Sequence, residues 1–107
     1  MACLLNLGRL DEAAVAYEES IKRVEELKDD RQLAVGKGNL GTVRMYQGRY
    51  KDALDAFDEA RETFENLNEP ASVATIWHQT GMVHEKAGQL EAAERAYRES
   101  LAIKVQQ

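Results

Sequence analysis

Apolar residues recur along the chain at spacings of three and four, and this spacing predicts helices with one apolar side each. Turn signals such as Asn68-Glu69-Pro70, and glycines at the segment ends, divide the pattern into blocks of similar length. The blocks expected to be helical are 10–28, 33–47, 51–67, 73–87 and 90–106. The sequence therefore predicts an all-α fold.

The same pattern returns with a period of 40 residues. A shift of 40 places Gly8 on Gly48 and Gly88, and we expect these three glycines at equivalent corners between helices. Other residues that coincide are Ala13, Ala53 and Ala93; Ala16, Ala56 and Ala96; and Tyr17, Phe57 and Tyr97. A fixed period of this kind is the signature of a repeat architecture. We expect one domain, 1–107, with a partial repeat over 1–28 and further repeats over 29–68 and 69–107.

The predicted helices alternate between two sequence types. Type A covers 33–47 and 73–87, and type B covers 10–28, 51–67 and 90–106. Short connections between consecutive helices imply antiparallel neighbours. We therefore expect antiparallel helical hairpins stacked into a right-handed superhelix, in which each hairpin contacts mainly the next one.

Local signals support these boundaries. Asp29 is suited to cap the helix that follows it, and Pro70 suits the first turn of the next type A helix. Gly36, Gly38 and Gly41 interrupt the first type A helix, at a cost of about 1 kcal/mol each in helix propensity. Such a cost favours a close approach of helices at these positions.

Composition and charge exclude several classes of function. The net charge of -5 and a pI near 5.0 argue against general binding of nucleic acid, which needs clustered Lys and Arg. No apolar run has the length needed to span a bilayer, so we expect no membrane partner. Cys3 cannot form an internal disulfide, and we interpret it as a buried small side chain in a reducing compartment. The expected location is the cytoplasm.

The repeated residues resemble the tetratricopeptide repeat. The second unit carries its pattern as Leu40, Gly41, Gly48, Tyr50, Ala53, Phe57 and Ala60. The third unit reads Thr80, Gly81, Gly88, Leu90, Ala93, Tyr97 and Ser100. The usual period is 34 residues, and the longer period here, with Gly38-Asn39-Leu40-Gly41, looks like the kinesin light chain and Pins/LGN class of adaptors and similar bacterial arrays. The resemblance implies a scaffold that binds a peptide or protein on a concave face lined by type A helices, with an extended peptide or a partner helix as ligand.

The resemblance also implies which residues line this groove. In the second unit they are Gly38, Asn39, Thr42, Met45 and Tyr46, and in the third His78, Gln79, Met82, Glu85 and Lys86. The aligned carboxamides of Asn39 and Gln79 can both donate to and accept from a peptide backbone. A solvated polar residue on an exposed face is the alternative for both.

The type A segments differ in charge from the rest of the chain. Lys37, Arg44 and Lys86 against Glu85 give +2, which leaves -7 for the remainder. A groove of this charge would favour an acidic peptide. Alternatively, Lys37 and Arg44 extend their stems along the core and pair with Asp55 or Asp58.

No constellation of residues predicts catalysis, a metal or a cofactor. His78 and His84 lie six residues apart on one helix and cannot chelate a metal together. We therefore expect a non-enzymatic interaction scaffold. A sensory or regulatory segment of a larger bacterial effector remains the alternative. The apolar ends of the repeat stack also predict either a piece of a longer array or self-association.

Overall fold

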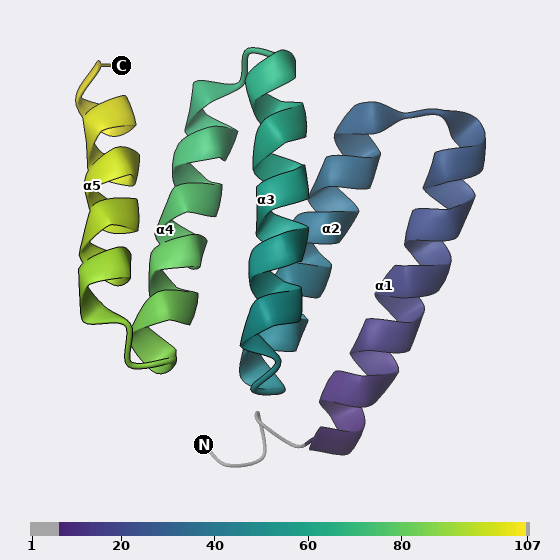
Figure 1. Cartoon of the computed structure of the whole chain (residues 1–107). Coiled ribbons are helices and arrows are strands. Elements are labelled where there is room, and N and C mark those ends of the chain that lie inside the picture. Colours follow the sequence, from purple (N-terminus) through teal and green to yellow (C-terminus); the bar gives the residue numbers. More distant parts are fainter. Residues whose placement is uncertain (1–6, 107) are drawn as a thin grey trace.

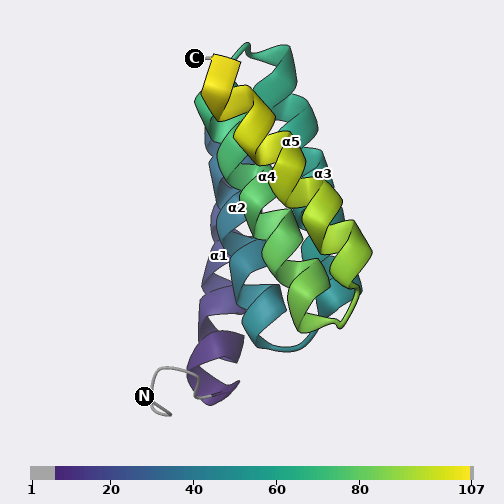
Figure 2. The ribbon, with the colours of Figure 1, turned by 90° about the vertical axis from the view of Figure 1, so that its left-hand side faces the viewer.

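The computed structural model describes residues 7–106, which form five helices in succession. They are α1 (Leu7–Leu27), α2 (Asp30–Tyr46), α3 (Tyr50–Asn66), α4 (Pro70–Lys86) and α5 (Leu90–Gln106). Within 7–106 there is no strand. Figure 1 shows the helices side by side in chain order, each antiparallel to the one before, and Figure 2 shows the stack from the α5 side. The predicted all-α stack of hairpins is confirmed.

All four turns between helices are built in the same way. Gly48 and Gly88 end α2 and α4 with φ of +79°, and Lys28 and Asn68 end α1 and α3 with φ of 57° and 56°. At Gly48 the amide donates to Met45 O at 3.0 Å, and the next amide, of Arg49, donates to Arg44 O at 2.8 Å. This left-handed cap satisfies the last carbonyls of the helix and turns the chain back on itself.

The helices begin at the predicted capping signals, but the two type A helices begin slightly earlier than the apolar pattern predicted. Asp29 caps α2, because its Oδ1 accepts the Gln32 amide at 3.1 Å, and Pro70 occupies the first turn of α4. Both type A helices begin three residues before the predicted 33 and 73. Their first turns are polar or contain proline, so the apolar period could not detect them.

The prediction for Gly8 was wrong. Gly8 is helical within α1, whereas Gly48 and Gly88 have positive φ and occupy equivalent corners. Glycine adopts this left-handed conformation where it ends a helix, and Gly8 does not end one. The prediction for Cys3 falls outside the described residues.

The hydrophobic core lies where α2, α3 and α4 meet. It contains Ala34, Met45, Ala53, Phe57, Ala60, Phe64, Val73, Ile76 and Val83. Alanine at 53 and 60 lets the helices approach, while the Phe57 ring is fully buried. The core therefore binds the α2–α3 hairpin to the first helix of the next hairpin.

Two of the helical glycines are explained by aromatic rings. A Cβ on Gly41 would lie 2.7 Å from Phe57 Cε1, and a Cβ on Gly81 would lie 2.6 Å from Tyr97 Cε1. Both distances are shorter than side chains tolerate, so each ring packs directly on the backbone of the neighbouring helix. This is the close approach predicted from the cost of glycine in a helix.

Trp77 of α4 lies at the boundary between the two hairpins. Its ring is half-buried, packs against the core, and is covered by the Arg61 guanidinium of α3 at 4.3 Å from the ring centroid. A cation above an indole face is favourable and keeps the charge near water. Trp77 therefore helps to join α3 to α4, across the boundary between hairpins.

Candidate functional site

The helices α2 and α4 contact each other along one side of the stack. Their equivalent positions form pairs at the 40-residue shift: Asn39 with Gln79, Thr42 with Met82, and Tyr46 with Lys86. Positions separated by three and four residues share one face of a helix. We call the surface made by these six residues the α2/α4 seam.

A hollow of about 190 Å³ lies at one end of the seam, between α2 and α4. Both carboxamides, of Asn39 and Gln79, line this hollow, together with apolar atoms of Phe64 and Ile76. The Asn39 side chain is exposed and the Gln79 side chain is half-buried. The structure thus brings the two predicted amides to one concave place, with donors and acceptors available above an apolar floor.

A second hollow, of about 330 Å³, lies at the other end of the seam. It is lined by Tyr46, Lys86 and the turn after α2, including Gln47 and Gly48. Lys86 Nζ lies 5.4 Å from the centroid of the Tyr46 ring, close enough for a cation–π interaction. This end of the seam presents one cation and one aromatic ring to solvent.

Thr42 and Met82 lie between the two hollows by their position in the helices. Both are half-buried, and the Thr42 hydroxyl donates to Gly38 O of its own helix at 3.2 Å. The hydroxyl oxygen can still accept a hydrogen bond from a ligand. By these positions, Thr42 and Met82 lie on the same helix faces as the residues of the two hollows.

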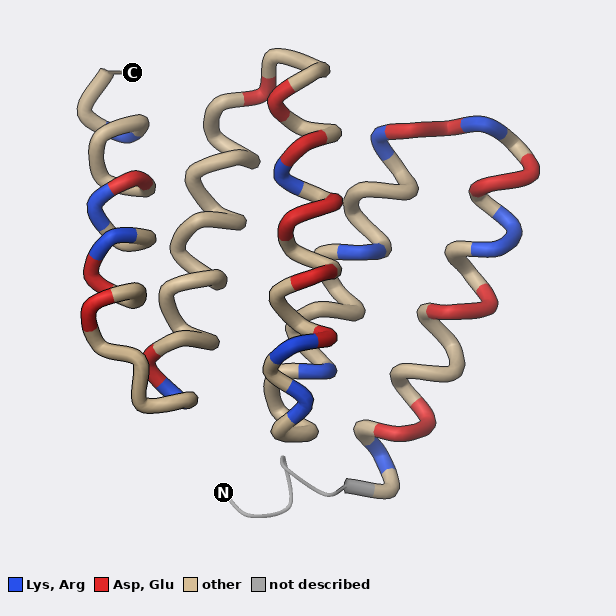
Figure 3. The backbone as a smooth tube through the Cα atoms, in the orientation of Figure 1, with Lys and Arg blue, Asp and Glu red and all other residues tan. Residues whose placement is uncertain are grey.

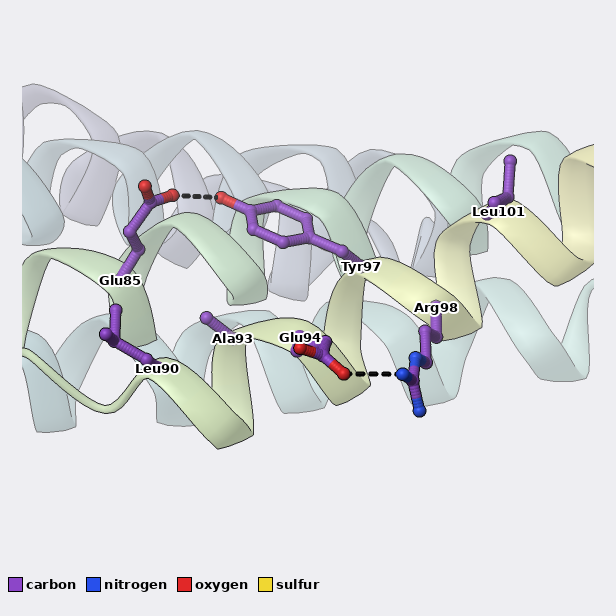
Figure 4. A pocket seen from close by; sticks show the side chains of 7 residues that line it. All are labelled: Glu85, Leu90, Ala93, Glu94, Tyr97, Arg98 and Leu101. Atoms are coloured by element: carbon purple, nitrogen blue, oxygen red, sulfur yellow. Dashed lines mark hydrogen bonds and ion pairs between the residues drawn. The ribbon is translucent and has the colours of Figure 1, made fainter.

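Three of the predicted groove residues contribute less to the seam or lie elsewhere. Met45 is 2% exposed and belongs to the core, although it also lines the second hollow. His78 and Glu85 instead meet Tyr97 of α5: the His78 and Tyr97 ring centroids are 5.2 Å apart, and the Tyr97 hydroxyl donates to Glu85 Oε1 at 2.7 Å (Figure 4). Since 45 and 85 are equivalent positions, this face of a type A helix packs mainly toward a type B helix.

Gly38 occupies the same face as Met45 and is buried. A Cβ at Gly38 would lie 3.4 Å from Ile76 Cδ1 of α4, which is a close but ordinary contact. The approach of α4 therefore does not by itself require a glycine at position 38, which lines the first hollow beside Asn39.

The expected basic character of the groove is largely lost in the structure. Lys37 pairs with Glu59 at 2.7 Å and Arg44 pairs with Glu18 at 3.2 Å, so both cations are held by type B helices. The predicted partners Asp55 and Asp58 were wrong, although the predicted kind of interaction was right. Figure 3 shows that the charged residues are concentrated on α1, α3 and α5, while α4 carries charge only at its end. Of the three cations counted for type A, only Lys86 contributes to the seam.

The Tyr97 hydroxyl leads to a pH-dependent prediction. Burial, and next its hydrogen bond to Glu85, raise the pKa of Tyr97 from 10.0 to about 12. Because the unfolded chain releases this proton at lower pH than the native chain, the contribution of Tyr97 to stability is complete below pH 10 and is lost as the pH rises toward 12. We expect the urea midpoint of the wild type to fall more steeply over this range than that of Tyr97→Phe. Parallel curves for the two proteins would contradict the raised pKa of Tyr97.

No group of three or more His, Cys, Asp or Glu side chains within residues 7–106 is arranged to hold a metal ion. His84 is half-buried, and its Nδ1 lies 2.7 Å from Gln89 Oε1 of the following turn. His84 therefore contacts the turn that follows its own helix. In the same part of the chain, none of the helices is long and apolar enough to cross a membrane.

Sequence reasoning missed some residues that line the first hollow. Val35 and Thr75 are equivalent positions one turn before Asn39 and Gln79, and Ser72 comes from the start of α4. The helical period could have found Val35 and Thr75, because each lies four residues before a carboxamide on the same face. Ser72 lies three residues before Thr75, so the same period includes it once α4 is known to begin at Pro70.

The stacked hairpins, with their type A helices in contact, define the chain as an α-helical repeat domain with the α2/α4 seam on one side. A family model described as tetratricopeptide repeat matches residues 32–104, and the chain belongs to this family. The resemblance read from the repeated residues is thereby confirmed. Domains of this family are in general non-catalytic scaffolds that mediate protein–protein interaction.

A solved structure provides a similar protein of the same class. The crystal structure of BtubC (BKLC) from P. vanneervenii, a kinesin light chain-like protein, matches with a TM-score of 0.85 and 27% sequence identity. The match covers 94% of this chain and 41% of that chain, so this chain spans about two fifths of its length. A search of curated proteins found no significant match.

Proposed function

We propose that the chain binds an extended peptide along the α2/α4 seam. The observation that supports this most strongly is that Asn39 and Gln79, at equivalent positions in successive repeats, line one hollow. Two carboxamides spaced along a groove can each hold a backbone N–H and C=O of an extended ligand. Peptide recognition of this kind depends on main-chain groups and tolerates variation in the side chains.

The remaining residues of the seam indicate which kinds of side chain the ligand would carry. Beyond the carboxamides, Thr42 and Met82 offer a partly apolar surface, and the last pair is Tyr46 with Lys86. Lys37 and Arg44 are already paired with glutamates, so a strongly acidic ligand has no special advantage. We propose a largely uncharged peptide with apolar side chains at its centre.

Replacement of Asn39 by alanine tests this proposal. Peptides would first be selected from a random library on the immobilised wild-type chain, and their affinities measured by calorimetry. We expect Asn39→Ala to weaken binding by roughly tenfold, because a buried peptide group loses its hydrogen-bond partner. The matched control is Asn66→Ala, since Asn66 is an exposed residue at the end of α3, outside the seam. Equal losses in the two variants, or no loss in either, would contradict the proposed site.

A further inference from the structure

The first hollow of the α2/α4 seam is uncharged and largely apolar. Among the described residues that line it, none is Asp, Glu, Lys, Arg or His. Its apolar side chains belong to Ala34, Val35, Phe64 and Ile76. Its volume of about 190 Å³ can be compared with an apolar cavity of about 150 Å³, which is large enough to bind benzene. The hollow therefore has room for one apolar side chain of a ligand.

The two hydroxyl groups of the hollow are already hydrogen-bonded within the chain. Ser72 Oγ donates to Glu69 Oε1 at 3.2 Å, and Thr75 Oγ1 donates to Ala71 O at 3.1 Å. A polar side chain of a ligand would therefore have to compete with the ligand's own main chain for the two carboxamides of the seam. An apolar side chain needs no hydrogen bond, so the hollow favours an apolar occupant.

Gly38 lies in the wall of this hollow, and the packing of the helices does not account for it. A Cβ at this position would lie 3.4 Å from Ile76 Cδ1, which is an ordinary contact, whereas a Cβ at Gly41 would overlap the Phe57 ring. Glycine within a helix is less favourable than alanine. A residue that is locally unfavourable, with no compensating contact, is typical of a functional position.

A side chain at position 38 would narrow the space between α2 and α4. Gly38 and Ile76 both line the hollow, and they face each other across it at the distance just given. The glycine therefore keeps the hollow wide enough for a side chain supplied by another molecule.

We propose that the first hollow binds one apolar side chain of the peptide, of the size of leucine or phenylalanine, and that Gly38 sets the size that is admitted. The inference rests on the proposed binding of a peptide along the seam. Asn39 and Gln79 hold the main chain of the peptide, and the side chain extends between α2 and α4 onto Phe64 and Ile76. The burial of this side chain adds to the affinity and makes one position of the peptide selective.

A double-mutant cycle between the chain and a peptide tests this site. A peptide selected from a random library on the wild-type chain would have each apolar residue replaced in turn by alanine, and calorimetry would measure the affinities. On the wild type, we expect one such replacement to weaken binding by about tenfold or more. Gly38→Val should weaken the unchanged peptide by about tenfold, and the peptide with alanine at that one position by at most about threefold.

Ala16→Leu on α1 is the matched control. It adds the same isopropyl group as Gly38→Val, at an exposed position outside the seam, and should leave both affinities unchanged. Circular dichroism would verify that each variant is folded. Gly38→Ala gives the same comparison with a smaller added group, and we expect it to weaken the unchanged peptide by about threefold.

The inference is overturned if no position of the peptide shows this dependence on Gly38, or if both Gly38 variants weaken all peptides equally. Asn39→Ala distinguishes this result from a failure of the proposed function. It should weaken the unchanged and the alanine-substituted peptides alike, because it acts on the main chain. If that loss is seen without the dependence on Gly38, the peptide binds along the seam but the side-chain site is wrong. If neither is seen, both proposals are wrong.

Discussion

Phe57→Ala should destabilise the chain by about 3–5 kcal/mol, the cost of deleting a buried phenylalanine from a packed core. The Phe57 ring is fully buried and lies directly on Gly41 of the neighbouring helix. It also belongs to the core that joins α2, α3 and α4, so its loss weakens contacts within and between hairpins. Urea denaturation followed by circular dichroism would measure the change in the free energy of unfolding.

Tyr97→Ala provides the internal comparison for this prediction. Tyr97 occupies the equivalent position on α5 and packs on Gly81 in the same way, but its side chain is only half-buried. The truncation therefore removes fewer contacts, and we expect a clearly smaller loss than for Phe57→Ala. Equal losses would show that the α3 and α5 faces are equally covered, against the structure.

Gly41→Ala is expected to destabilise the chain although alanine is the better helix former. The new Cβ would lie 2.7 Å from Phe57 Cε1, and this ring is fully enclosed and cannot move away. Overpacking of this kind costs about 1–3 kcal/mol, against a gain of about 1 kcal/mol in helix propensity. We expect a lower urea midpoint for the variant.

Gly38→Ala separates the cost of overpacking from the gain in helix propensity. It makes the same chemical change in the same helix, but its Cβ would lie 3.4 Å from Ile76 Cδ1, a distance that side chains tolerate. The gain in propensity should then dominate, so stability should be unchanged or higher. If both variants were destabilised to the same extent, the specific contact between Gly41 and Phe57 would not be the cause.

Much of the fold could be predicted because local signals and the period agree. Asp29, Gly48 and Pro70 each mark a helix boundary for a physical reason that acts within a few residues. The helical setting of Gly8 could not be read in this way, because the 40-residue shift does not distinguish a glycine within a helix from one at its end. Likewise, Arg61 covers Trp77 only because α3 and α4 stack across the hairpin boundary.

The candidate site was predicted in part. The repeat alignment correctly paired Asn39 with Gln79, which the structure brings to one hollow. It could not separate the two faces of a type A helix, because Met45 and Glu85 lie one position away from Tyr46 and Lys86. A step of one residue turns about 100° around a helix, which is enough to move a side chain from the seam into the packing between helices. Only the three-dimensional stack decides which side is covered.

Nuclear magnetic resonance with a peptide selected on the wild-type chain tests the central claim most directly. Amide chemical shifts of the chain would be followed during titration with that peptide. We expect the largest changes at residues 39, 42 and 46 and at 79, 82 and 86, which together form the α2/α4 seam. Changes confined to the outer faces of α1, α3 and α5, with the seam unaffected, would contradict the account.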